Sequence, residues 1–151
     1  MKQFISVKSY ANLCDLSERT IRRYMAMEAI DFITKSSSRT LIAFSELTKN
    51  CVISLTVGDN DLILQADTGN AEAQNDLGVL FLRHEKPDLA VYWLNLAAKQ
   101  QQADAMQLLG TCYALGKGVE KNRNLAMMWV AKAASLGSVL ANQQMAGIFQ
   151  N

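Results

Sequence analysis

The chain has 151 residues, half of them hydrophobic, which fits one ordinary domain or two small ones with a real core. Fifteen basic and 14 acidic residues give a net charge of +1, which excludes strong global attraction to nucleic acid or to a membrane but allows a local basic patch. The longest uncharged apolar stretch, around residues 51–57, is too short to cross a bilayer. We therefore expect no membrane segment and no secretory signal.

The side chains that usually carry chemistry are scarce. His84 is the single histidine, and Cys14, Cys51 and Cys112 lie far apart in the sequence. This spacing offers no metal-ligand set and no phosphate-binding motif, although a Cys–His pair formed in space would be an enzymatic alternative. We expect a binding protein and not an enzyme, without cofactor, metal or small-molecule substrate. Unpaired, separated cysteines are typical of buried thiols in the cytoplasm.

The first 50 residues predict a small compact module. Residues 7–13 and 18–27 predict two short helices, capped by Ser6 and Ser17 and separated by a tight turn. Two short β-type runs follow at residues 32–34 and 40–44, with a polar tip between them, and predict a hairpin.

The motif Leu16-Ser17-x-Arg19-Thr20-Ile21-Arg22-Arg23-Tyr24 resembles that of small winged helix-turn-helix domains of the MerR and excisionase type. Residues 1–50 hold eight basic and five acidic residues, a local charge of +3. The resemblance implies that helix 18–27 enters a major groove of double-stranded DNA. The implied DNA-binding residues are Ser17, Arg19, Thr20, Arg22, Arg23, Lys35 and Arg39. The alternative is that the arginines form only a solvated helix face.

Residues 47–57 are apolar and β-branched, and periodicity alone cannot separate a helix from a strand at this length. We favour a helix. Residues 61–69 resemble the second helix of a degenerate repeat, so residues 51–69 are interpreted as a connecting helix followed by a half-repeat.

The remainder of the chain repeats itself. Residues 71–78 match residues 103–110 at an offset of 32, and residues 90–98 match residues 126–134 at an offset of 36. A third, partial copy covers residues 139–146. Periods of this size are typical of stacked helical hairpins, because a single hairpin cannot bury both of its apolar stripes.

The pattern A-x-A-x-x-x-L-G, the loop Leu115-Gly-Lys-Gly-Val119 and the pattern A-x-x-W-x-x-K-A-A-x-x-G at residues 126–137 resemble the Sel-one-like repeat, a relative of the tetratricopeptide repeat. The first copy lacks the Gly-Lys-Gly-Val segment, so we expect a tighter turn there. The resemblance implies a superhelical scaffold that binds other proteins and catalyses no reaction. By resemblance to tetratricopeptide grooves, the candidate partner contacts are Glu72, Asn75, Arg83, Asp104, Gln107 and Thr111.

The last helix, from residue 139 onward, has no partner helix after it in the sequence. We hypothesise a dimer or partner contact there, and the alternative is ordinary packing onto the preceding hairpin. The candidate interface residues are Leu140, Met145, Ile148 and Phe149.

Together these patterns predict a mainly α-helical chain with a winged helix-turn-helix module at residues 1–50, a connection at 51–69 and an α-α superhelical repeat array at 70–151. The expected function is a DNA-binding transcriptional regulator whose array mediates dimerisation or partner binding. The alternative is a protein–protein adaptor with no role at DNA.

Overall fold

The computed structural model describes residues 1–149, and side chains as far as residue 147. The fold is mainly helical and divides into two compact units, residues 1–67 and 68–151. None of the described helices combines the length and the apolarity needed to cross a bilayer.

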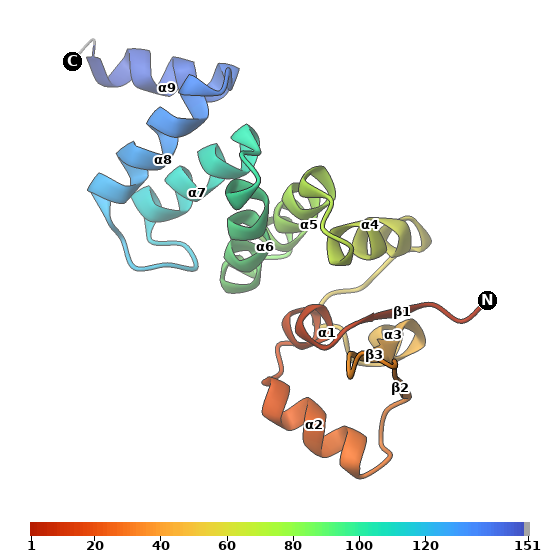
Figure 1. Cartoon of the computed structure of the whole chain (residues 1–151). Coiled ribbons are helices and arrows are strands. Elements are labelled where there is room, and N and C mark those ends of the chain that lie inside the picture. Colours follow the sequence, from red (N-terminus) through yellow and green to blue (C-terminus); the bar gives the residue numbers. More distant parts are fainter. Residues whose placement is uncertain (150–151) are drawn as a thin grey trace. The chain divides into compact units, whose positions relative to one another are not determined.

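The first unit combines short helices with a small sheet (Figure 1). Its elements are β1 (Phe4–Ser6), α1 (Val7–Leu13), α2 (Glu18–Ala26), β2 (Phe32–Thr34), β3 (Thr40–Ala43), the 3-10 turn η1 (Phe44–Glu46), α3 (Leu47–Asn50) and α4 (Val57–Asp67). Strand β3 is central, and both neighbours are antiparallel to it: Ile42 pairs with Ile5 on one side and with Phe32 on the other. The sequence analysis did not predict β1.

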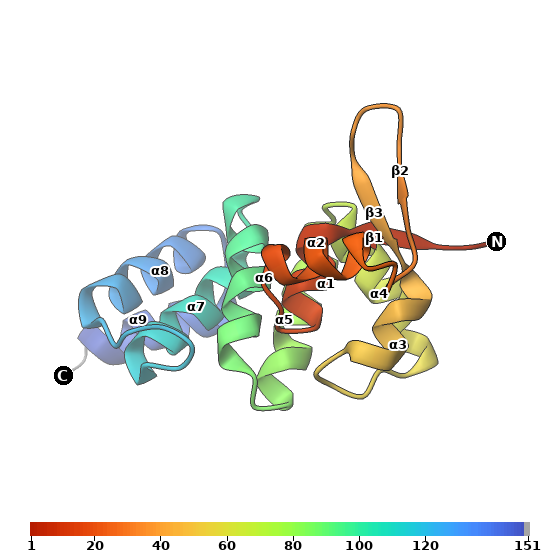
Figure 2. The same cartoon turned by 90° about the horizontal axis from the view of Figure 1, so that it is seen from below.

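Both predicted caps are confirmed. The Ser6 hydroxyl accepts a hydrogen bond from the Ser9 N–H at 3.2 Å, and the Ser17 hydroxyl accepts one from the Thr20 N–H at 3.1 Å, so each satisfies an N–H that the first helical turn leaves unpaired. Between the helices, Asp15 takes a left-handed conformation with φ of 51°. The predicted hairpin is also present and extends beyond the helices of its unit (Figure 2).

The continuous helix favoured for residues 47–57 is wrong. Helix α3 ends at Asn50, residues 51–56 form neither helix nor strand, and α4 starts at Val57. The chain leaves the helix because the Val52 N–H donates to the carbonyl of Leu13, at 3.1 Å, instead of to a carbonyl of its own turn. Asp59 then accepts a hydrogen bond from the N–H of Thr56 at 2.7 Å, next to the start of α4.

The second unit is a series of antiparallel helical hairpins, as Figure 1 shows in green to blue. Its helices are α5 (Ala71–Arg83), α6 (Pro87–Lys99), α7 (Ala103–Leu115), α8 (Arg123–Ser135) and α9 (Val139–Phe149). Residues 84–86 join the first pair, whereas residues 116–122 join the second, so the expected tighter first turn is confirmed.

Glycines allow the two helices of each hairpin to approach closely. A Cβ on Gly78 would lie 2.7 Å from side-chain atoms of Leu94, and a Cβ on Gly110 would lie 2.6 Å from Val130 Cγ2. These contacts are equivalent in the two repeats. Trp93 of the first hairpin is a large apolar side chain, and it is buried in the packed interior.

The longer second loop folds back onto the array. Gly118 has φ of +69°, and a Cβ there would lie 2.4 Å from the carbonyl oxygen of Pro87. The loop therefore approaches the start of α6 at a distance that only a glycine tolerates.

Candidate functional site

Basic side chains form one face of α2. Arg19, Arg22 and Arg23 are all exposed. Arg22 makes a long ion pair with Glu18, with 3.8 Å between Nη2 and Oε2, and the Arg23 guanidinium lies 5.7 Å from the centre of the Tyr24 ring. Exposed contacts of this kind contribute little interaction energy, so the arginine side chains remain accessible to an anionic partner.

The polar residues beside these arginines already take part in hydrogen bonds. The Ser17 hydroxyl lies 2.9 Å from that of Thr20 and also caps the helix. Lys35 and Arg39 are exposed on the hairpin, where the Lys35 N–H donates to the Arg39 carbonyl at 3.0 Å.

A cleft of about 710 Å³ lies in the first unit and brings three cations together from separate elements: Lys8 of α1, Arg22 of α2 and Arg39 next to β3. Glu18 is the one acid among its described lining residues. Sequence reasoning missed Lys8, because its position on a short helix carries no signal until the sheet places α1 near the hairpin.

The candidate partner contacts of the repeats separate into two groups. Glu72, Arg83 and Asp104 are exposed, and Thr111 is half-buried. Asn75 and Gln107 are buried, with 6% and 8% of their surface exposed. The Gln107 amide donates to the Thr111 hydroxyl at 3.3 Å.

The residues expected at an oligomer interface differ in environment. Leu140 is exposed, whereas Met145 is half-buried and packs against the core of the array. The side chains of Ile148 and Phe149 lie outside the described residues.

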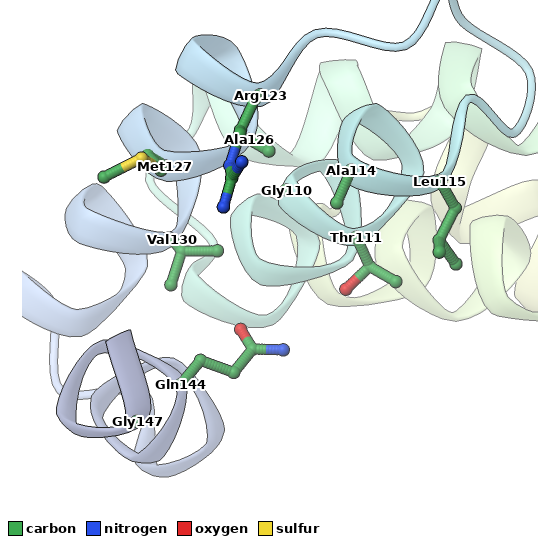
Figure 3. A pocket seen from close by; sticks show the side chains of 10 residues that line it. All are labelled: Gly110, Thr111, Ala114, Leu115, Arg123, Ala126, Met127, Val130, Gln144 and Gly147. Atoms are coloured by element: carbon green, nitrogen blue, oxygen red, sulfur yellow. The ribbon is translucent and has the colours of Figure 1, made fainter. Parts of the chain in front are cut away.

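A cavity of the second unit lies between α7, α8 and α9 (Figure 3). We call it the second groove; its volume is about 610 Å³. It is lined by Gly110, Thr111, Ala114, Leu115, Arg123, Ala126, Met127, Val130, Gln144 and Gly147. The Arg123 side chain extends into it from α8, and the Gln144 amide points into it from α9 (Figure 3).

A smaller cavity of about 360 Å³ occupies the corresponding place one repeat earlier, and we call it the first groove. Leu82, Pro87 and Leu108 line it. At the repeat offsets, these positions correspond respectively to Ala114, Arg123 and Gln144 of the second groove. One architecture thus carries two different linings.

Burial acts on the thiols of all three cysteines. Burial raises the pKa of the Cys14 thiol to about 12, although a hydrogen bond with Tyr10 opposes the shift. Burial also raises the pKa of Cys51 and of Cys112. Over the described residues, no group of three or more His, Cys, Asp or Glu side chains could hold a metal ion.

Comparison with protein families identifies the repeats. The Sel1 repeat model matches residues 71–101 and 103–138, so the chain contains Sel1 repeats as the motifs predicted. The comparisons lend no support to the winged helix-turn-helix resemblance of the first unit.

Solved structures agree with this result, and two curated relatives are also similar to part of this chain. The chain is 36% identical over 86 residues to "DAP3-binding cell death enhancer 1" of Rattus norvegicus and of Mus musculus; the match covers 56% of this chain and 17% of each relative. A Sel1 repeat protein from Oxalobacter formigenes is 29% identical with a TM-score of 0.55, over 67% of this chain and 31% of that one. A protective antigen of uropathogenic Escherichia coli with an SLR fold is 28% identical with a TM-score of 0.54, over 60% and 21%.

Proposed function

We propose that this chain, whose residues 71–101 and 103–138 are Sel1 repeats, is an adaptor that binds another protein through its helical array. The single observation that carries the proposal is the repeat array itself, because stacked hairpins present extended binding surfaces. The proposal includes no reaction. We also propose a cytoplasmic location, because the three cysteines are free and thiols stay reduced in that compartment.

The surface of the array supports this function. The second groove, with a volume of about 610 Å³, is a concave surface on the array in which part of a partner protein can lie. The array also carries exposed charges at Glu72, Arg83 and Asp104, and charges of this kind add specificity to a protein interface.

The curated relatives add a second line of support. They are named for binding another protein, DAP3, and the matched segment covers 17% of each of them. We take from this that a repeat segment of this kind occurs in a partner-binding protein, and we leave the partner of the present chain to experiment.

The test is affinity capture with the full chain from its native host, followed by binding of the purified candidate. We expect the partner to bind the parent chain and the variant Arg19→Ala/Arg23→Ala equally, and to bind Asp104→Lys at least about tenfold more weakly. Asp61→Lys, an exposed acid on α4, is the matched control for the charge change. Loss of the partner only with the arginine variant would refute the adaptor function of the array.

Double-stranded DNA is a second candidate partner, and one specific observation favours it. The cleft that gathers Lys8, Arg22 and Arg39 lies in the same unit as the arginine face of α2. Cations spread over several elements suit a phosphate backbone, and a capped helix with exposed arginines suits a major groove. In this alternative the array dimerises the regulator or recruits its partner.

Fluorescence anisotropy with duplex DNA over a salt series tests the alternative. Binding to DNA predicts an affinity that falls steeply with salt and is lost in Arg19→Ala/Arg23→Ala. Equal, weak binding of DNA by the parent and the variant would reject the DNA alternative and favour the adaptor function.

A further inference from the structure

We propose that the second groove binds an internal segment of a partner protein in which a Glu or Asp side chain adjoins a large apolar side chain. The inference rests on the proposed adaptor function and adds the chemistry that the partner must present. Four observations support it, from charge, packing, the repeat and exposure.

The first observation is an uncompensated positive charge. Arg123 is the one charged residue among the described lining of the groove. It is absent from the ion pairs of the described residues, which involve Lys2, Arg22 and Lys49. It is also the first residue of α8, where the N–H groups and the helix dipole favour an anion. A carboxylate is therefore the group that this position complements.

The second observation is the apolar lining beside this charge. Ala114, Ala126 and Val130 present small apolar side chains, and Leu115 and Met127 are exposed large ones. Methionine adapts its shape to varied apolar ligands. An apolar side chain next to the carboxylate would cover these groups from water.

The third observation is the difference between the two repeats. The first groove has Pro87 where the second has Arg123, and Leu108 where the second has Gln144. It also carries one acid and one base, Glu85 and Lys117, so its lining has no net charge. The fold therefore does not require a cation or an amide at these positions, and the second groove carries both.

The fourth observation concerns the source of the carboxylate. Arg123 is exposed to solvent, and its side chain extends into the groove (Figure 3). Gln144 is exposed as well, and its amide can donate to a backbone carbonyl of a segment that continues past it. A side-chain carboxylate of a continuous segment can reach such a position while the segment continues towards Gln144.

The experiment is a peptide selection on the full chain. Random nine-residue peptides are displayed in one library as internal segments and in a second library with a free C-terminus. We expect the internal library to enrich Asp or Glu next to Leu, Ile, Met or Phe. An enriched peptide, synthesised with blocked ends, should bind about tenfold more tightly than its Glu→Gln counterpart, as measured by fluorescence anisotropy.

Variants of the chain then locate the site. In Arg123→Gln the two peptides should bind equally, whereas Lys121→Gln, which removes a nearby loop cation, should keep the tenfold difference. Ala114→Leu/Gln144→Leu introduces the residues that the first groove has at these positions, and it should weaken the binding of both peptides. Leu82→Ala in the first groove is the matched control and should leave the affinity of both peptides unchanged. Thermal unfolding confirms that each variant is folded.

Four results would overturn the inference: no enriched peptide, enrichment without an acid, an acid preference that survives Arg123→Gln, or enrichment only with a free C-terminus. A whole partner protein that still binds Ala114→Leu/Gln144→Leu would preserve the adaptor function and reject this groove alone.

Discussion

The backbone N–H of Ser6 donates to both carboxylate oxygens of Asp67, at 3.2 and 3.1 Å, and the Ser6 hydroxyl donates to Oδ1 at 2.5 Å. The Ser9 hydroxyl donates to the same oxygen at 2.5 Å. The last residue of α4 thus fixes the junction between β1 and α1 within the first unit. A charged acceptor at the start of a helix also interacts favourably with the helix dipole.

Replacing this carboxylate should destabilise the first unit. We expect Asp67→Ala to lower the free energy of unfolding by about 1.5–3 kcal/mol, because three donors lose a charged acceptor. Urea unfolding followed by circular dichroism measures the change. Asp61→Ala on the exposed side of the same helix is the control and should change little. An equal effect of the two variants would show that the hydrogen bonds contribute no net stability.

The close helix approach at Gly110 should be sensitive to a single methyl group. Gly110→Ala places a Cβ 2.6 Å from Val130 Cγ2 and 3.1 Å from the Ala126 carbonyl oxygen, so we expect a loss of about 1–3 kcal/mol. Gly147→Ala is the matched control, since its Cβ meets nothing within 4 Å, and should be neutral or stabilising. Chemical denaturation compares the two. Partial rescue of Gly110→Ala by Val130→Ala would identify the clash, and its failure would assign the loss elsewhere.

Stability should decline in alkaline solution. Burial raises the pKa of Cys14 from its ordinary value of 9.0 to about 12, and burial also raises that of Tyr10. A raised pKa in the folded chain means that folding favours the protonated, neutral group, so the stability is fully present below the unfolded pKa of the thiol. It is lost progressively as the pH rises from about 9 towards 12.

Urea unfolding between pH 7 and pH 11 measures this decline. Cys14→Ala should show a shallower loss above pH 9 than the parent, because it lacks one of the titrating groups. Parallel curves for the parent and the variant would argue against a buried, protonated thiol at this position.

The cleft of the first unit gives a prediction for the DNA alternative. If the cleft holds a phosphate, Lys8→Gln and Arg39→Gln should each weaken duplex binding and reduce the salt slope by about 1. Lys49→Gln, a lysine on α3 that pairs with Glu46 at 3.3 Å, is the control. A salt slope unchanged by Lys8→Gln would remove this residue from any contact with DNA.

Local features of the sequence determined much of the fold. The caps at Ser6 and Ser17 and the hairpin at residues 32–43 could be predicted because caps and turns depend on neighbours within a few residues. The repeat offsets of 32 and 36 could be predicted because each copy carries the same helical periodicity. The motifs of these copies resemble the Sel-one-like repeat, and the Sel1 repeat model matches residues 71–101 and 103–138.

Only the tertiary structure determined which residues far apart in the sequence contact one another. It paired β1 with β3, ended α3 where Val52 bonds to Leu13, and gathered Lys8 with Arg22 and Arg39. It also distinguished two grooves that share one repeat pattern. Each of these features depends on which side chains meet after folding, and periodicity along a single helix carries no information about the residue that faces it from another.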